Sequence, residues 1–253
     1  MNKEFTFFKD TVADILEKIV SEEQNIKKAA DIMARNIIKD KIIHAIGTGG
    51  HSNMGAEEMF WRAGGLVPIN AIFDAGINLI HGARRTTIIE RTPGYGVKVM
   101  DAYNIGKTAD ETIIIINACG INTMTIDVAL EAKKRKMKTI GITSTSFASL
   151  VPKDHPSRHP SNKNLHDLVD VFINNHQPIG DAVVELEGAD QKVAPVSTIC
   201  NSFVIQLLVI ETVKKIIELG KKPLIWKSAN MPGGDEANRE YFEEYSKRIK
   251  HLL

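Results

Sequence analysis

Three short segments are rich in small residues and short polar side chains, and each lies at the end of an apolar run. The glycine segment is residues 47–53 (Gly-Thr-Gly-Gly-His-Ser-Asn), the cysteine segment is residues 117–123 (Asn-Ala-Cys-Gly-Ile-Asn-Thr), and the serine segment is residues 143–146 (Thr-Ser-Thr-Ser). Backbone N–H groups in such turns, together with hydroxyls at a helix start, can bind an oxyanion. Each charged hydrogen bond to a phosphate would contribute roughly 1.5–3 kcal/mol. The segments therefore predict an anion site; the alternative is that they are only tight turns and helix caps.

The ligand-binding residues predicted from these segments share a glycine backbone, a hydroxyl, an amide or a thiol. They are Gly49, Gly50, Ser52, Asn53, Asn117, Cys119, Gly120, Asn122, Thr123, Thr143, Ser144 and Ser146. A thiol is a weak donor, and no histidine stands beside Cys119 in the sequence. We therefore do not expect Cys119 to act as a nucleophile.

Two residues near the glycine segment are predicted to move protons. Glu58 lies on the helix expected over residues 52–64, away from its apolar positions, and is the leading candidate for a general base. The alternative for Glu58 is an ion pair with Arg62, four residues later. Glu57 shares that side of the helix and is the weaker candidate. His51 lies within the glycine segment and could exchange a proton with a ligand; the alternative is a loop histidine packed against the next strand.

Other titratable residues carry weaker signals. His81 and Glu90 belong to the connection between the second and third apolar runs, which often covers a site of this kind. His155 and His159 have the spacing of zinc ligands on a helix, but a proline follows each and disfavours a helix there. His44 alternates with apolar residues in the first run and is expected to be a packing residue. We therefore predict no metal and no cofactor.

A dinucleotide site is the main alternative to a phosphate site. The glycine segment fits G-x-G-x-x-S, and Asp74 follows the second apolar run, where a ribose-binding acid would be expected. However, Ser52 stands in place of the third glycine, and His51 would lie on the path of the pyrophosphate. A P-loop is excluded because no Gly-Lys-Ser/Thr follows the glycines. Nucleotide binding is therefore the less favoured interpretation.

The elements that must position these residues alternate along the chain. Five short runs rich in isoleucine and valine show little alternation of polarity, as strands buried on both faces should; they are residues 41–46, 66–73, 112–117, 137–143 and 168–174. Helical patterns are clearest over residues 52–64 and 122–136. Alternating strands and helices predict an α/β fold whose parallel sheet is covered by helices on both faces. Ligands bind such sheets outside the carboxyl ends of the strands, where the three segments lie.

The two ends of the chain are expected to be largely helical. An apolar stripe over residues 3–39 predicts a long helix with a break near residues 22–25. Further expected elements are a small strand within residues 181–188, a helix over 197–219 and a terminal helix over about 235–251. Because no Pro-, Gly- or Ser-rich linker separates two halves, residues 1–253 are expected to form one domain. Its parts are a helical segment 3–39, an α/β core 40–190 and C-terminal helices 196–251.

Composition limits the classes of function. The chain has 253 residues, of which 43% are hydrophobic and 25% charged, as is typical of a globular protein. With 32 Lys and Arg against 31 Asp and Glu, the net charge of +1 supplies no general attraction to nucleic acid or an acidic membrane. There are two cysteines, and no apolar stretch reaches the roughly 20 residues of a membrane span. We expect a cytoplasmic protein without nucleic-acid or membrane partners.

The wider sequence resembles the SIS (sugar isomerase) domain, and most closely a family of stand-alone SIS proteins related to phosphoheptose isomerases. The motifs that carry the resemblance extend over nearly the whole chain: Gly49-Gly50-His51-Ser52, Glu57-Glu58, Arg62 to Leu66, Glu90-Arg91, Arg158-His159, Gly180-Asp181-Ala182, Ser197-Thr198, Ser228-Ala229-Asn230 and Gly233-Gly234-Asp235. The resemblance implies a three-layer α/β/α sandwich with five parallel strands in flavodoxin-like order. It also implies a homodimer, and a phosphosugar site that uses the glycine, cysteine and serine segments.

The cysteine segment departs from the family pattern. Where the family usually has Ser-x-Ser-Gly, this chain has Asn117-Ala118-Cys119-Gly120, and Ile121 stands where a basic residue is common. Losing two hydroxyl donors would cost roughly 2–3 kcal/mol, near a hundredfold in phosphate affinity. The loop is then expected to hold phosphate through backbone N–H groups and Thr123, or to bind a different ligand.

Together these observations predict a phosphosugar-binding protein that acts as an aldose–ketose isomerase on a sugar phosphate or aminosugar phosphate. Glu58 would be the base, with His51 assisting. Such an enzyme opens the sugar ring and moves a proton between adjacent carbons through an enediol. A binding or sensor protein without turnover is the second hypothesis, and a lyase that uses the same glutamate is the third.

Overall fold

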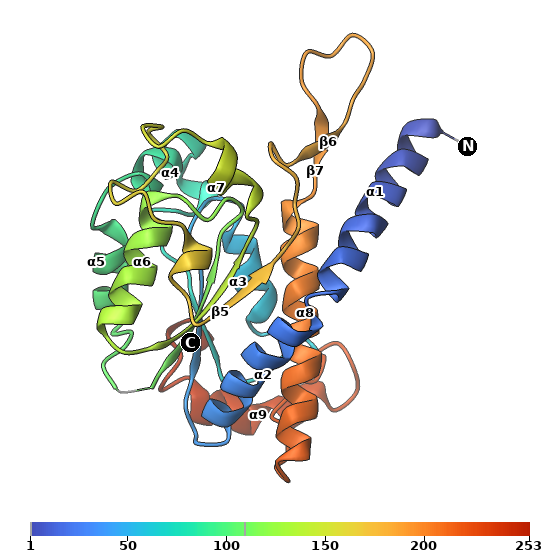
Figure 1. Ribbon diagram of the computed structural model, residues 1–253. Coiled ribbons are helices and arrows are strands. Elements are labelled where there is room, and N and C mark those ends of the chain that lie inside the picture. Colours follow the sequence, from blue (N-terminus) through green and yellow to red (C-terminus); the bar gives the residue numbers. More distant parts are fainter. Residues whose placement is uncertain (1, 109) are drawn as a thin grey trace.

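The computed structural model describes residues 2–108 and 110–253, and its centre is a sheet of five parallel strands (Figure 1). The strands are β1 (Ile43–Gly47), β2 (Ile69–Ile72), β3 (Thr112–Ile116), β4 (Lys138–Thr143) and β5 (Val171–Asn174). They are hydrogen-bonded in the order β2-β1-β3-β4-β5. Each strand overlaps one of the five apolar runs. The predicted α/β class, the parallel sheet and its flavodoxin-like order are confirmed.

Helices cover both faces of the sheet, so the predicted three-layer sandwich is also confirmed (Figure 1). One face packs against α2 (Glu23–Ile37), α3 (Asn53–Met59) and α8 (Ser197–Glu218). The other face packs against α5 (Tyr95–Ala102) and α6 (Thr123–Lys134). Further helical segments are α1 (Lys3–Val20), α4 (Ala83–Glu90), α7 (Ser146–Leu150), α9 (Gly234–Tyr245) and the 3-10 turns η1 (Leu79–His81), η2 (Leu165–Asp167) and η3 (Lys250–Leu252). None of the helices in the described residues has the length and apolarity needed to span a membrane.

The central strand β3 shows why these strands lack an alternation of polarity. Ile113 and Ile115 belong to one apolar cluster, together with residues of α5 and α6. Ile114 and Ile116 belong to the other cluster, together with residues of α2 and α8. Because successive side chains of a strand point to opposite faces, and both faces are covered, every position of the strand interior must be apolar.

Two segments extend beyond the sandwich in Figure 1. The predicted N-terminal helix is divided at residues 21–22 into α1 and α2, close to the expected break, and α1 projects away from the sheet. The expected small strand is β6 (Ala182–Val184), which pairs antiparallel with β7 (Val193–Pro195) in a projecting hairpin. The sequence analysis did not predict β7, because three residues ending in proline carry almost no strand signal.

The helix predicted over residues 52–64 is wrong beyond Met59. Phe60 is extended (φ −96°, ψ 130°), and its ring packs edge-on against Phe73 with centroids 5.3 Å apart. The Trp61 ring packs against Phe242 at 5.8 Å. Contacts with residues far away in the sequence therefore end this helix one turn early.

Two other helical predictions also need correction. The terminal helix expected over 235–251 ends at Tyr245, because the fully buried Ile249 is extended (φ −118°, ψ 109°) and packs in a cluster with Trp226. The connection between β2 and β3 contains α4 and α5, neither of which was predicted. Each has eight residues, too few for a clear helical period.

A close backbone contact joins β1 to α3. A Cβ added to Gly47 would lie 2.1 Å from the carbonyl oxygen of Ser52 and 2.4 Å from the backbone nitrogen of Asn53. No side chain fits at such distances, so glycine is required where the chain turns from the strand into the helix. This contact fixes the shape of the glycine segment.

Gly47→Ala is expected to lower the free energy of unfolding by about 2–3 kcal/mol, because the methyl group must displace backbone atoms rather than a flexible side chain. Urea denaturation measures the change. Gly180→Ala is the control: Gly180 has φ 79° but no atom within 4 Å of an added Cβ, so it should lose only about 1 kcal/mol from backbone strain. Equal losses for the two variants would contradict the close contact.

Candidate functional site

At the carboxyl edge of the sheet, the glycine and cysteine segments are hydrogen-bonded to each other. Asn117 Nδ2 donates to the carbonyl oxygen of Thr48 at 3.1 Å. The Ala118 N–H donates to Ser52 Oγ at 3.3 Å, so the hydroxyl of Ser52 joins the two segments instead of capping α3. The ends of β1 and β3 therefore form one continuous polar edge.

The cysteine segment folds around the side chain of Asn117. Asn117 Oδ1 accepts from the N–H groups of Cys119 at 3.1 Å and Gly120 at 2.8 Å, so these two N–H groups already have a partner. Cys119 Sγ lies 2.8 Å from Asn122 Oδ1, to which the thiol donates. Burial raises the pKa of Cys119 to about 11, so the thiol stays protonated at neutral pH. This agrees with a structural role for Cys119.

The serine segment directs its hydroxyls toward the chain that follows β5. Ser144 Oγ donates to the carbonyl oxygen of Gln177 at 2.8 Å, and Ser146 Oγ lies 3.2 Å from the same oxygen and 2.7 Å from Ser144 Oγ. Thr143 contacts the cysteine segment, since a Cβ on Gly120 would lie 2.6 Å from Thr143 Oγ1. The serine segment thus completes the edge, with both serine hydroxyls engaged by protein atoms.

Several buried polar atoms at this edge have no hydrogen-bond partner among the described residues. They are Asn53 Oδ1, Thr143 Oγ1 and Gln177 Nε2. An unsatisfied buried polar atom costs roughly 1–3 kcal/mol, so proteins rarely leave such groups together without a reason. Their gathering beside the three segments is typical of a site that receives a polar ligand or ordered water.

Glu90, the last residue of α4, reaches into the glycine segment. Its carboxylate accepts a hydrogen bond from the Gly50 N–H, and Glu90 Oε2 lies 3.2 Å from the position that a Cβ on Gly49 would take. Asn117 Nδ2 lies 3.3 Å from that same position. Burial raises the pKa of Glu90. The glycine segment therefore surrounds a carboxyl group whose environment favours the protonated form.

The first residues of α6 lie beneath another part of the chain. Asn122 and Thr123 are buried, Asn122 forms an isolated β-bridge with Arg158, and Thr123 Oγ1 lies 3.5 Å from the Arg158 carbonyl oxygen. The buried Arg158 guanidinium donates to the carbonyl oxygens of Ala148 and Val151. The hydroxyl of Thr123 therefore faces protein rather than the open edge.

The two predicted proton-transfer residues differ in their surroundings. Glu58 Oε1 accepts from Gln206 Nε2 on α8 at 2.6 Å and from Arg62 Nε at 3.0 Å, so the ion pair weighed as the alternative is present. Its side chain is 18% exposed. His51 is exposed at the turn next to Gly50. In the described part of the chain, neither the Glu58 nor the His51 side chain forms a hydrogen bond with Gly49, Gly50 or Glu90.

The remaining histidine candidates have separate partners. His155 Nδ1 lies 2.7 Å from Ser157 Oγ, whereas His159 Nε2 lies 3.2 Å from Asp127 Oδ1. Asp127 also accepts from the Gly94 N–H at 2.7 Å, which joins α6 to the start of α5. Among residues 2–108 and 110–253, no group of three His, Cys, Asp or Glu side chains is placed to hold a metal ion.

The sequence analysis missed Gln177 and gave Glu90 too little weight. No motif marks Gln177, and the available signal was its position just beyond the carboxyl end of β5. Glu90 was a weak candidate because nothing in the sequence shows where the connection between β2 and β3 places its carboxylate. The general rule that ligands bind beyond the carboxyl ends of the strands is the signal that could have directed attention to both residues.

Comparisons with known proteins identify the family of this chain. A model of the SIS domain matches residues 7–144. The chain is 36% identical to UPF0309 protein TTE0306 of Caldanaerobacter subterraneus over 241 residues, covering 94% of this chain and 95% of the relative. It is 36% identical to a UPF0309 protein of Geobacillus thermodenitrificans, covering 92% and 90%.

Among solved structures, a phosphoheptose isomerase from Francisella tularensis is similar with a TM-score of 0.48 and 13% identity, covering 85% of this chain and 100% of that one. The domain match covers more than half of this chain, and the UPF0309 relatives match nearly all of it. The chain therefore belongs to the SIS-domain proteins and, within them, to the UPF0309 family.

Proposed function

We propose that the protein binds a sugar phosphate or aminosugar phosphate at the carboxyl edge and interconverts its aldose and ketose forms. The observation that carries this proposal is the carboxyl group of Glu90 against Gly49 and Gly50. It supports the proposal in two ways. The Gly50 N–H donates to an oxyanion, the Glu90 carboxylate, and a carboxyl group with a raised pKa is better suited than an ordinary one to accept and return a proton.

Buried hydrogen-bond donors that have no partner support the binding of a phosphate group at this edge. The hydroxyl of Thr143 and the amide nitrogen of Gln177 are buried donors without a partner in the described part of the chain. A phosphate oxygen between the cysteine and serine segments would satisfy donors of this kind. The sugar carbons would then lie toward Glu90 and His51, at the glycine segment.

Isomerisation needs one group that removes a proton from the carbon next to the carbonyl and returns it to its neighbour. We assign this step to Glu90, which takes the proton as a carboxylate and returns it as the neutral acid through an enediol. The exposed His51 is placed to assist ring opening by exchanging a proton with a sugar hydroxyl. Glu58, whose carboxylate accepts from Gln206 and Arg62, is the second candidate for the base.

A binding protein without turnover is the second candidate function. Two observations favour it. The N–H groups of Cys119 and Gly120 already donate to Asn117, and the Ser144 hydroxyl already donates to the carbonyl oxygen of Gln177. Few donors are left to hold a developing enediolate. Hydrogen exchange between solvent and sugar decides between the two functions.

In D₂O, the wild-type protein incubated with a panel of aldose and ketose phosphates should incorporate deuterium at C1 or C2, measured by NMR. Glu90→Gln is expected to lower the incorporation rate about 10²–10⁴-fold, because the amide cannot accept the proton. Glu243→Gln, which changes an exposed glutamate of α9, is the control and should leave the rate unchanged.

Loss of incorporation in Glu58→Gln but not in Glu90→Gln would move the base to Glu58. If no member of the panel is labelled while the sugar phosphates still raise the melting temperature, the binding function is the correct one.

The raised pKa of Glu90 also predicts how stability depends on pH. The folded protein holds the Glu90 proton more tightly than the unfolded chain, whose carboxyl has the ordinary pKa of 4.5. As pH rises above that value, the unfolded state loses its proton first, so wild-type stability falls up to the folded-state pKa. Glu90→Gln removes this effect. Its free energy of unfolding relative to wild type should therefore rise as the pH increases above 4.5. A difference that stays constant over this range would contradict the burial of Glu90.

We also propose that the protein forms a homodimer through its projecting N-terminal helix. Phe5 and Phe7 of α1 are 74% and 53% exposed, and α8 exposes Ile210 and Ile217. Exposed aromatic side chains on one projecting helix are typical of a surface that a partner covers.

Analytical ultracentrifugation at micromolar concentration should show a dimer for wild type and a monomer for the double variant Phe5→Ser/Phe7→Ser. Met231→Ser removes a side chain that is 59% exposed in the C-terminal region, and it should leave the dimer intact. A monomeric wild-type protein would exclude this arrangement.

A further inference from the structure

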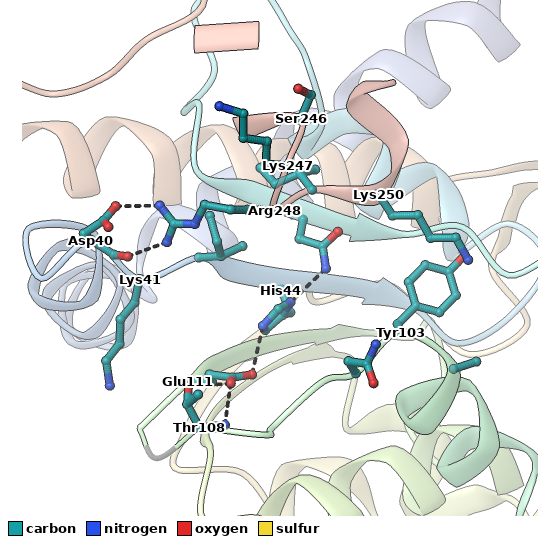
Figure 2. A pocket seen from close by; sticks show the side chains of 15 residues that line it. Asp40, Lys41, His44, Tyr103, Thr108, Glu111, Ser246, Lys247, Arg248 and Lys250 are labelled. Carbon is teal, nitrogen blue, oxygen red and sulfur yellow. Dashed lines mark hydrogen bonds and ion pairs between the residues drawn. The ribbon is translucent and has the colours of Figure 1, made fainter. Parts of the chain in front are cut away.

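A cavity of about 630 Å³ lies at the amino edge of the sheet, opposite the proposed phosphosugar site (Figure 2). Its walls come from the chain before β1 and the start of β2, from the end of α5 with the loop that follows, and from residues 246–250 after α9. This volume is in the range of small-molecule sites. The cavity plays no part in the function proposed above.

The floor of the cavity is a chain of hydrogen bonds through His44. Asn70 Nδ2 lies 3.0 Å from His44 Nδ1 and, as the donor, makes Nδ1 an acceptor. His44 Nε2 then carries the hydrogen and donates to Glu111 Oε2 at 3.1 Å, as Figure 2 shows. His44 was expected to be a packing residue, and it is buried, but its ring is also the centre of a polar network.

Glu111 is fully occupied within this network. Its carboxylate also accepts from the N–H groups of Gly106 at 2.7 Å and Thr108 at 2.8 Å, and from Thr108 Oγ1 at 2.6 Å. Burial alone would raise the pKa of Glu111, but the hydrogen bonds from His44, Thr108 and Gly106 lower it to about 2. The Glu111 carboxylate is therefore ionised at neutral pH, and it makes its hydrogen bonds to the protein rather than to a ligand.

Asn70 differs from Glu111 because half of its amide is unused. Its side chain lines the cavity, and it is 5% exposed. Oδ1 has no hydrogen-bond partner among the described residues, and the bond from Nδ2 to His44 fixes the orientation of the amide. Asn70 Oδ1 lies at the amino edge, whereas the other buried atoms without a partner, on Asn53, Thr143 and Gln177, lie at the carboxyl edge. It is a buried acceptor without a partner, on a residue that lines the cavity.

The mouth of the cavity is positively charged. Lys41, Lys247, Arg248 and Lys250 line it, whereas the acidic lining residues are Asp40 and Glu111. Both acids are already paired, since Arg248 Nη1 lies 2.7 Å from Asp40 Oδ1. Lys250 Nζ lies 4.3 Å from the centre of the Tyr103 ring, so the ammonium group is held over the mouth (Figure 2). The side chains around the opening therefore favour an anion.

We propose that this cavity is a second binding site, for a small phosphorylated metabolite that carries hydroxyl groups. A hydroxyl donates to Asn70 Oδ1 at the floor, and the phosphate faces Lys247 and Lys250 at the mouth. The proposal rests on the cavity, the unpaired acceptor and the charge at the opening, and it does not depend on the function of the carboxyl edge.

The test is an NMR titration of the full chain, labelled with ¹⁵N, with ribose 5-phosphate and separately with sulfate. Ribose 5-phosphate should produce a saturable shift of the His44 ring nitrogens, because its hydroxyl binds the neighbouring amide. Sulfate has no hydrogen to donate at neutral pH and should bind at least tenfold more weakly. Equal affinity for sulfate would overturn the assigned hydroxyl contact.

Lys247→Ala/Lys250→Ala changes two exposed side chains and should weaken the ribose 5-phosphate shift of His44 at least tenfold. Lys133→Ala/Lys222→Ala removes two exposed lysines that do not line the cavity and is the matched control, expected to bind as wild type. If both double variants weakened the binding of ribose 5-phosphate equally, the effect would come from the net charge of the protein, and the proposed site would be wrong. Shifts confined to the Gly49 and Gly50 amides would also overturn it, while leaving the proposed phosphosugar site intact.

Discussion

The side-chain amide of Asn117 is the contact on which the carboxyl edge depends. Its nitrogen donates to the carbonyl oxygen of Thr48 in the glycine segment, while its oxygen accepts from the N–H groups of Cys119 and Gly120. One side chain therefore fixes the spacing between the ends of β1 and β3 and also the turn into α6. A serine has one oxygen on a shorter side chain, so it lacks the separate donor and acceptor atoms with which the amide contacts both segments at once. With three hydrogen bonds this amide makes the cysteine segment rigid, and the N–H groups of Cys119 and Gly120 are no longer free donors.

This rigidity constrains where a phosphate can bind. Two like charges about 4 Å apart repel by about 4 kcal/mol at the dielectric constant of a protein surface. A phosphate directly against Glu90 is therefore disfavoured whenever that carboxyl group is ionised, whereas Thr143 and Gln177 carry buried donors that have no partner among the described residues. In a sugar phosphate the carbonyl carbon and the phosphate are at opposite ends of the carbon chain. A sugar phosphate can therefore present its carbonyl carbon to Glu90 and keep its phosphate away from that carboxyl group, which inorganic phosphate cannot do.

The fold could be predicted from the sequence to the extent that local patterns determine it. The strands were found because both faces of β3 and its neighbours are buried, which removes polar residues from the sequence itself. The end of α3 was not found, because it depends on Trp61 packing against Phe242, far along the chain. The candidate site, like the fold, could be predicted only where local sequence patterns determine it. The three segments were recognisable from composition, whereas the position of Glu90 depends on α4, and the hydrogen bonds of Asn117 depend on the register of β1 against β3.

Helix dipoles account for part of the contrast between the two edges of the sheet. Helices that follow parallel strands begin at the carboxyl edge, where their N–H groups favour anions, and end at the amino edge, where their carbonyl groups favour cations. Lys247, Arg248 and Lys250 follow the last turn of α9, so a dipole alone could explain why cations are stable there. It does not explain Asn70, whose oxygen lies buried and unpaired on the floor of a cavity. The unsatisfied hydrogen bond at the floor, rather than the charge at the mouth, is what distinguishes a ligand site from a stabilised helix end.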